Sequence, residues 1–291
     1  MVNLLALNIK DVKHLAKLLR TPVGEIERLC DQAHRLYTRR EVKKKAGAVR
    51  VLHDPSPRLK RVQKRLNWLL QRVELPASMH GCRRGRSIID NALPHAGKPM
   101  VLKMDVEDFF PRIRFQQVYR MFEAYGCSPD VAGVLTRLTT YNHQLPQGAP
   151  TSPSIANMVY AHTARRLQGL AEAHKADYSD YVDDNTFSGP RHLPRLVPLV
   201  SRILKQSGFK ANPHKVQTLD CSREQIVTGV KVNDGIDAPP AYVLETERLI
   251  REYRSPGNEN PAVTRAQIEG RINHIGRLNS REGSRLRAML H

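Results

Sequence analysis

The chain has 291 residues and carries 47 lysines and arginines against 28 aspartates and glutamates, a formal net charge of +19. A charge this large predicts a polyanionic partner, while the lack of a bilayer-length apolar run or a signal peptide argues against a membrane protein. The four cysteines lack zinc or disulfide spacing, and neither a Walker A loop nor a G-x-G-x-x-G motif occurs. We therefore expect a cytoplasmic protein that binds nucleic acid and no membrane.

The N-terminal part of the chain has the apolar spacing of helices. Residues 10–37 predict two short helices that separate at Thr21-Pro22, with Thr21 as a cap. A further helix is predicted over residues 59–73, with apolar residues inward and basic residues outward. The first two helices precede the first predicted strand pair and the third follows it.

Residues 35–65 form the most basic stretch, with 12 lysines and arginines against two acidic residues. Such a run is often only a solvated face. Here, however, residues 43–52 predict a β-hairpin with its turn at Gly47, so that cations project from both strands. A hairpin of this kind suits the binding of phosphates.

A buried strand is predicted over residues 100–105, because an apolar run ends there in Asp105. The strand is expected to be followed by a turn that Pro111 closes. A carboxylate at a strand end is a common position for metal and phosphate sites.

A second loop of interest joins two helical stretches. Residues 116–141 predict helix, and the Gly/Pro-rich residues 145–154 lead into another helix, with Thr151 or Ser152 as its cap and Pro153 as its first residue. Such a loop offers backbone N–H groups to an anion, although an ordinary capped helix explains the same pattern.

The acidic stretch after this helix organises the candidate site. Residues 178–182 and 185–188 predict a hairpin with Asp183 and Asp184 at its tip. A solvated Asp-Asp turn is the plain alternative. With Asp105 at a second strand end, three carboxylates would hold two divalent ions about 3.5–4 Å apart, which is the arrangement that nucleotidyl transfer requires.

The remaining chain alternates short helices and strands, which predicts an α+β fold. A helix is expected over 193–207, a turn over 208–216 and a strand or hairpin over 225–235. Residues 248–291 hold nine arginines against four glutamates and predict a small basic helical lobe, with a linker at 255–261.

Five motifs follow one another between residues 39 and 233. They are the basic hairpin, the strand ending in Asp105, the Gln-Gly-Ala-Pro-Thr-Ser loop at 147–152, the Tyr-Val-Asp-Asp box at 181–184 and the turn at 208–215. In this order and spacing the chain resembles a reverse transcriptase of the bacterial retron type.

Two shorter strings resemble marks of the retron type: Asn-Ala-Leu-Pro-His at 91–95 and Val-Thr-Gly at 227–229. In that family they are associated with recognition of a cognate structured RNA. The resemblance therefore implies RNA-binding roles for Asn91, His95, Val227, Thr228 and Gly229.

The resemblance implies a right-hand polymerase with fingers, an antiparallel-sheet palm and a small helical thumb. The expected divisions are N-terminal helices (1–38), fingers (39–99), palm (100–112), a helical insertion between fingers and palm (113–144), palm (145–236) and thumb (237–291).

Catalytic roles carry over to the matching positions. Asp105, Asp183 and Asp184 resemble the ligands of two Mg²⁺ ions, with Mn²⁺ as an alternative and the Val106 carbonyl as an extra ligand. Lys215 resembles the general acid that protonates the pyrophosphate.

The resemblance also implies a nucleotide site. Arg50 and one of three consecutive lysines beginning at Lys43 would hold the triphosphate, and Gln147 and Gly148 would pack against the nucleotide and template. Phe110 would lie against the sugar 2′ position. Its neighbour Phe109 is expected in the core, since neighbours in an extended segment face opposite ways.

The implied reaction is RNA-directed DNA synthesis in which a structured noncoding RNA is copied into a short cDNA. Priming from a guanosine 2′-hydroxyl of that RNA would give branched RNA–DNA (msDNA), in the setting of phage defence. Partners would be the RNA, its cDNA, dNTPs and, left open, an effector or toxin protein. The alternatives are a non-retron bacterial reverse transcriptase with ordinary or protein priming, and a non-catalytic RNA-binding scaffold.

Overall fold

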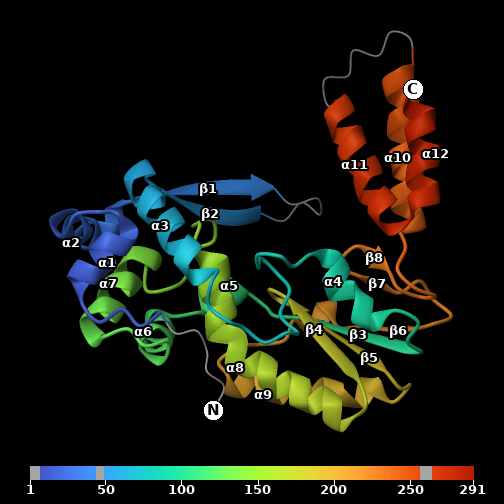
Figure 1. The fold of residues 1–291 in the computed structure, drawn as a ribbon. Helices are drawn as coiled ribbons and strands as arrows, with labels where there is room; N and C mark the ends of the chain where they lie inside the picture. The colour runs from blue at the N-terminus through green and yellow to red at the C-terminus, as the bar shows by residue number, and fades with distance from the viewer. Residues whose placement is uncertain (1–6, 44–48, 256–263) are drawn as a thin grey trace.

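The computed structural model describes residues 7–43, 49–255 and 264–291. Its helices and strands form an N-terminal lobe, a central sheet with its covering helices, and a C-terminal helical lobe (Figure 1). The α+β class predicted from the sequence is confirmed. None of the described helices is both long enough and apolar enough to cross a membrane.

The N-terminal lobe combines helices with a two-stranded antiparallel sheet. The strands pair from Tyr37↔Pro55 to Lys43↔Val49, so the basic hairpin is confirmed, while the expected turn at Gly47 lies outside the described residues. The elements of this lobe are α1 (Val12–Leu19), α2 (Val23–Asp31), β1 (Tyr37–Lys43), β2 (Val49–Pro55), α3 (Pro57–Leu70), α6 (Phe115–Ala124) and α7 (Pro129–Thr139).

Two features of this lobe differ from the sequence prediction. Thr21 does not cap α2, because its hydroxyl donates backward to the Leu19 carbonyl oxygen at 2.9 Å and Pro22 occupies the N-cap position. The helix expected over 116–141 is two helices: Gly126, with a φ of 88°, follows the end of α6, and the Ser128 side chain caps α7.

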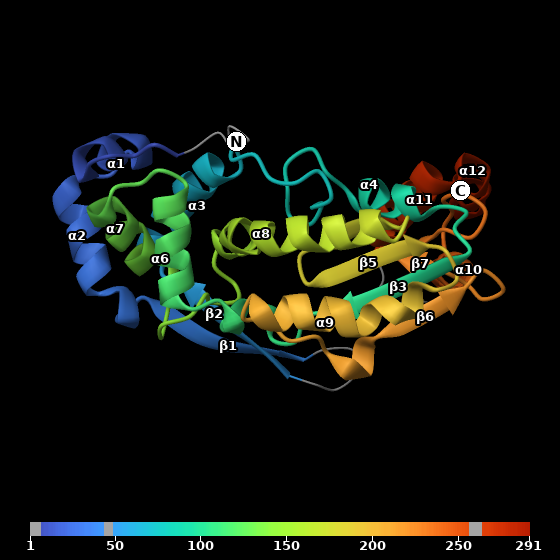
Figure 2. The ribbon, with the colours of Figure 1, turned by 90° about the horizontal axis from the view of Figure 1, so that it is seen from below.

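The central sheet has four antiparallel strands in the order β4-β5-β3-β6. Helices α8 and α9 lie beneath it in Figure 1 and run along it in Figure 2, while the short α4 lies above. The elements of this part are α4 (Ile88–Ala92), β3 (Met100–Asp105), α8 (Ser152–Ala173), β4 (Asp177–Tyr181), β5 (Asp184–Gly189), α9 (Val197–Gln206) and β6 (Gln217–Asp220).

Burial explains why β3 reads as a continuous apolar run. Val101, Leu102 and Met104 are all buried, and the strand ends at Asp105 as predicted. Thr151 is the N-cap residue of α8, but its hydroxyl makes no capping hydrogen bond, and Pro153 is the second rather than the first residue of that helix.

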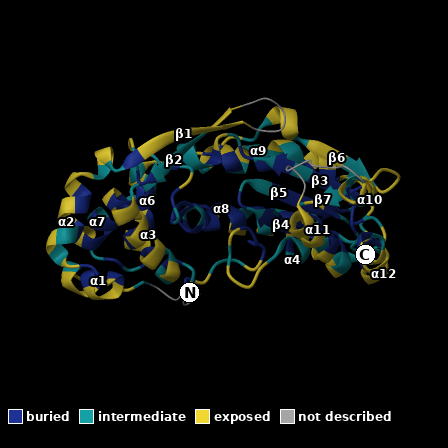
Figure 3. Ribbon diagram, turned by 90° about the horizontal axis from the view of Figure 1, so that it is seen from above, coloured by how far each residue is buried: buried dark blue, intermediate teal, exposed yellow. Residues whose placement is uncertain are grey.

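The C-terminal lobe is a three-helix unit with a core of its own, formed by α10 (Pro240–Arg254), α11 (Arg265–Leu278) and α12 (Ser280–Leu290). It therefore begins before residue 248, the start predicted from sequence. Gly276 and Gly283 face each other where α11 meets α12, and a Cβ on Gly283 would collide with the Gly276 backbone. In Figure 3 many of the buried residues lie along α8 and the sheet, whereas many residues on the outer sides of the lobes are exposed.

Candidate active site

The hairpin of β4 and β5 turns at Val182-Asp183. Val182 has a φ of +67° and Asp183 does not have a positive φ, which is the pattern of a type II′ turn. A β-branched residue at positive φ is strained, and such strain concentrates at functional sites. Asp184 already belongs to β5, so the tip holds one carboxylate and not both, a correction of the sequence prediction.

Gly81 packs directly against this turn. A Cβ at Gly81 would lie 2.6 Å from the Val182 nitrogen, so only glycine fits without a shift of the turn. The preceding residues run along the free edge of β4: the His80 N–H donates to the Asp180 carbonyl oxygen, and the Asp180 N–H donates to the Ser78 carbonyl oxygen, both at 2.9 Å. The turn is therefore supported from outside the sheet.

The three predicted carboxylates meet at one end of the sheet. Asp105 and Asp184 are opposite each other in the β3–β5 register, and the Val106 N–H donates to the Asp183 carbonyl oxygen at 2.9 Å. Burial raises the pKa of Asp183, and the nearby Asp105 raises it further. Burial also raises the pKa of Asp184, although Lys103 opposes this effect. The site thus concentrates negative charge that needs a counter-ion.

Two lysines supply part of that counter-charge. The Lys215 Nζ lies 2.9 Å from Asp105 Oδ1, and the Lys103 Nζ lies 3.7 Å from Asp184 Oδ2. The structure therefore brings Lys215 to the carboxylates, 110 residues beyond Asp105 in the chain. Its role as a general acid stays a prediction.

The donor set suits a hard divalent cation. Within the described residues, no three His, Cys, Asp or Glu side chains form a ready metal cage, so water, backbone carbonyls such as that of Val106 and substrate phosphates would complete the coordination. This is the usual situation for Mg²⁺, which is bound by one or two carboxylates together with phosphates and waters.

A buried polar network behind the turn was not predicted from the sequence. The Tyr160 and Tyr178 hydroxyls both donate to Asn185 Oδ1 at 2.8 Å. The Asn185 amide in turn donates to the carbonyl oxygens of Met104 at 3.3 Å and Asp183 at 3.5 Å. Asn185 thus links the backbones beside Asp105 and Asp183, and a polar residue within a buried strand was its only sequence signal.

The predicted nucleotide-binding residues lie along the N-terminal hairpin and the loop before α8. The His53 N–H donates to the Gln147 carbonyl oxygen at 2.7 Å, and a Cβ on Gly148, whose φ is +108°, would lie 3.3 Å from the His53 carbonyl oxygen. Arg50 and Lys43 are exposed on β2 and β1. The two lysines after Lys43 lie outside the described residues.

The two phenylalanines after Asp105 differ in burial, but not for the reason expected. They belong to the short helix α5 (Phe109–Arg112), which contains Pro111, so the predicted extended segment and Pro111-closed turn are wrong. Phe109 is 2% exposed and packs 5.4 Å from the Tyr160 ring and 5.5 Å from the Phe209 ring. Phe110 is only partly buried.

Comparison with known proteins identifies the family. Residues 42–232 match the family described as reverse transcriptase (RNA-dependent DNA polymerase). The chain belongs to the reverse transcriptases. Retron Mx65 reverse transcriptase from Myxococcus xanthus is 35% identical over 275 residues, and retron Ec86 reverse transcriptase from Escherichia coli is 30% identical over 237 residues. These relatives place the reverse transcriptase in the retron type.

The matched regions cover most of this chain but not all of each relative. They cover 87% of this reverse transcriptase and 64% of the Mx65 protein, and 77% and 72% in the Ec86 comparison. A structure of Candida albicans telomerase with a fragment of telomeric RNA aligns over 87% of this chain and 56% of that one, with a TM-score of 0.51 and 10% identity. That likeness shows the fold alone, a right-hand polymerase.

The two retron-type strings lie together, but mostly inside the reverse transcriptase. Asn91, His95 and Val227 are fully buried, and the Asn91 amide donates to Thr228 Oγ1 at 3.2 Å. These three side chains are shielded from solvent here, and their RNA-binding role stays a prediction. Thr228 is partly buried and Gly229 is exposed, at the turn between β7 (Ile226–Val227) and β8 (Val230–Lys231).

His95 shows what this buried patch does. Its Nδ1 lies 2.7 Å from Ser188 Oγ and its Nε2 lies 2.7 Å from Ser179 Oγ, so it joins both strands of the hairpin that carries Asp183. Burial lowers the pKa of His95 to about 4, which keeps the ring neutral. The string at 91–95 thus stabilises the sheet that carries the carboxylates.

Proposed function

We propose that this chain is an RNA-directed DNA polymerase that copies a structured noncoding RNA into a short cDNA. The proposal rests on Asp105 and Asp183, which come from distant segments and are brought together by the backbone hydrogen bond between Val106 and Asp183. The net charge of +19 and the basic N-terminal hairpin suit a nucleic acid substrate. Retron-type relatives support the same assignment.

The residues of the site would divide the work as follows. Asp105 and Asp183, with Asp184 as a third carboxylate, would hold two Mg²⁺ ions, which activate the attacking hydroxyl and stabilise the leaving oxygen when bound. Lys215 would donate a proton to the departing pyrophosphate. Positioning and charge stabilisation account for most of the catalysis in such transfers.

The nucleotide site would use the loop and the hairpin. Arg50 and Lys43 would hold the triphosphate, Gln147 and Gly148 would pack against the base pair, and Phe110 would lie against the sugar. The hydrogen bond that joins His53 to Gln147 fixes the hairpin to the loop, which supports a single nucleotide site formed by both.

The retron type further implies priming from a guanosine 2′-hydroxyl of the template RNA, a branched product and a role in phage defence within the cytoplasm. An effector protein would be an additional partner. Of the five residues to which the resemblance assigns RNA binding, Thr228 and Gly229 are not fully buried and are the more accessible candidates for RNA contact.

Primer extension on an RNA template with Mg²⁺ tests this function. Asp183→Asn should abolish extension and leave RNA affinity within about twofold, because it removes metal-binding charge and spares the basic surfaces. Extension at the wild-type rate would refute the metal-site assignment. Sequencing the nucleic acid that copurifies tests the retron type, which requires one short cDNA joined to one RNA.

A further inference from the structure

The outer face of α3 carries an unusual combination of side chains. Lys60, Lys64, Trp68 and Arg72 follow one another at four-residue spacing, so they form one row along the helix and its end. Trp68 is the only tryptophan of the chain and is 59% exposed. A large aromatic side chain left in solvent is available for contact with a partner, and here it stands within a row of cations.

The charges beside Trp68 are available to a partner. Lys60, Arg61 and Lys64 are exposed, and their side chains make no ion pair or hydrogen bond among the described residues, although the Lys60 charge acts on Asp54 at longer range. The Arg72 guanidinium lies 5.0 Å from the Trp68 ring centroid, a cation–π contact. By contrast, Arg65 is engaged with the backbone at the end of α1, where it donates to the Arg20 carbonyl oxygen at 2.6 Å.

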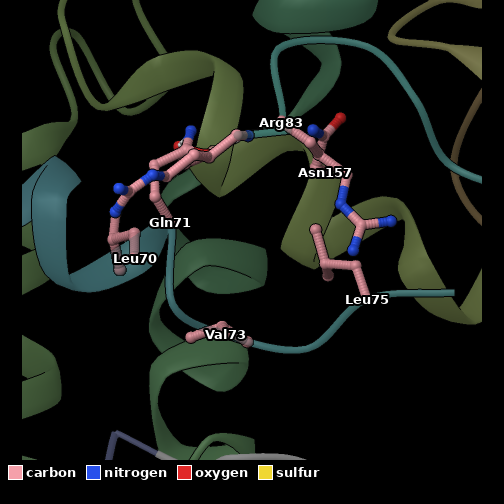
Figure 4. A pocket seen from close by; sticks show the side chains of 8 residues that line it. Leu70, Gln71, Val73, Leu75, Arg83 and Asn157 are labelled. Atoms are coloured by element: carbon pink, nitrogen blue, oxygen red, sulfur yellow. Dashed lines mark hydrogen bonds between the residues drawn. The ribbon is translucent and has the colours of Figure 1, made fainter. Parts of the chain in front are cut away.

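This face leads to the catalytic turn. One helical turn beyond Trp68, the Gln71 amide donates to the Cys82 carbonyl oxygen at 2.9 Å and accepts from the Arg84 N–H at 3.0 Å. Figure 4 shows Gln71 beside Arg83 and Asn157 at this junction. Gly81, which packs against Val182, immediately precedes it in the chain. The row on α3 and the catalytic turn therefore adjoin the same short segment.

Cations that follow a backbone, combined with an exposed aromatic ring, are what single-stranded nucleic acid requires, since unpaired bases stack on the ring while phosphates meet the cations. A duplex keeps its bases stacked internally and gains nothing from the ring. We propose that the outer face of α3 binds single-stranded RNA on its way to the catalytic turn, with a base stacked on Trp68. The proposal deepens the proposed function, because it assigns a path to the template.

The single tryptophan allows a direct test. Intrinsic fluorescence is titrated with three RNA–DNA hybrids: one with a 5′ single-stranded RNA extension, one blunt, and one with an abasic extension that keeps the phosphates but has no bases. Quenching is expected with the first hybrid only, at the concentration where fluorescence anisotropy of labelled hybrid shows binding. Equal quenching with the abasic extension, or none with the intact extension at saturation, would overturn the proposal.

Variants separate stacking from charge. Trp68→Ala should weaken binding of the extended hybrid about tenfold or more and leave the blunt hybrid unchanged, while Trp68→Phe should retain most of the affinity. Leu244→Ala is the control, since Leu244 is 63% exposed on α10, beside Glu245. If Trp68→Ala binds the extended hybrid with unchanged affinity, the proposed stacking on Trp68 is refuted.

The Asp183→Asn variant distinguishes this proposal from the proposed function. It should show the same quenching as the wild type, because stacking on Trp68 needs no catalysis. Absence of primer extension by the wild type would refute the polymerase assignment and leave the proposed RNA binding on α3 intact. Absence of quenching in both proteins would refute the RNA binding on α3 and leave the polymerase assignment intact.

Discussion

The acidic end of the sheet and the patch that holds the retron-type strings both involve the hairpin of β4 and β5 but use their residues in opposite ways. At the acidic end, Asp183 and Asp184 have raised pKa values and lie beside a strained turn. In the patch, Asn91 and His95 are buried; the Asn91 amide donates to Thr228, and both His95 ring nitrogens lie within hydrogen-bond distance of serine hydroxyls. A short motif can therefore mark either chemistry or packing, and burial is what distinguishes the two.

Phe109 and Phe110 show the same contrast between packing and chemistry in two adjacent residues. Their substitutions have the largest expected effects. Phe109→Ala should lower the free energy of unfolding by about 3–5 kcal/mol, because it empties a buried aromatic cluster. Phe110→Ala should change stability much less but admit ribonucleotides, because the ring would no longer exclude a 2′-hydroxyl. Urea unfolding and single-nucleotide incorporation of dNTP and rNTP measure both. If Phe109→Ala is the variant that relaxes sugar choice, the assignment is reversed.

Gly81 tests the strained turn from outside the sheet. A methyl group at Gly81 would lie 2.6 Å from the Val182 nitrogen, so the Val182 backbone must move. A displacement of about 1 Å beside a reacting group costs on the order of 100-fold in rate. We expect Gly81→Ala to lose about that much primer-extension activity while remaining folded.

Gly169→Ala is the matched control, because no atom lies within 4 Å of the added Cβ on α8. It should leave activity unchanged. Activity near the wild-type level in Gly81→Ala would mean that the turn accommodates the shift.

His95 tests the patch through pH. Its folded pKa of about 4 lies below the ordinary value of 6.5, so the unfolded chain takes up a proton first as pH falls. Its stabilising contribution is complete above about pH 6.5 and is lost as the pH falls toward 4, with a cost of about 2 kcal/mol between pH 7.5 and 5. The loss between these two pH values should be smaller by that amount in His95→Asn. If the free energy of unfolding of the wild type and of His95→Asn falls equally with pH, His95 is not a buried, neutral histidine in the folded protein.

Tyr160→Phe should have the smallest effect. The variant removes one of the two hydroxyls that donate to Asn185, so the Tyr178 bond still holds the amide. We expect a loss of about 1 kcal/mol in stability and a few-fold decrease in kcat, with KM for dNTP unchanged. A rise in KM without a change in kcat would mean that the network affects substrate binding rather than the position of the turn.

Local sequence signals predicted much of the fold and the acidic centre. The apolar run before Asp105, the hairpin before Asp184 and the alternation of helices with strands were readable because each follows from side-chain periodicity. The α5 helix was missed because a Phe-Phe-Pro segment has no helical period in four residues. The network at Asn185 and the contact of Gly81 with Val182 depend on residues distant in sequence, which no local pattern reports.

The register of the central sheet also sets the order in which the site comes into existence during synthesis. β3 pairs on one side with β5 and on the other with β6, so its partners emerge from the ribosome roughly 80 to 120 residues later. At about 5–20 residues per second, the apolar β3 strand waits on the order of 6–24 s for both neighbours. Until then Asp105 lacks the neighbouring carboxylates of β5 and its turn, so the proposed site for synthesis forms well after the basic hairpin has left the ribosome.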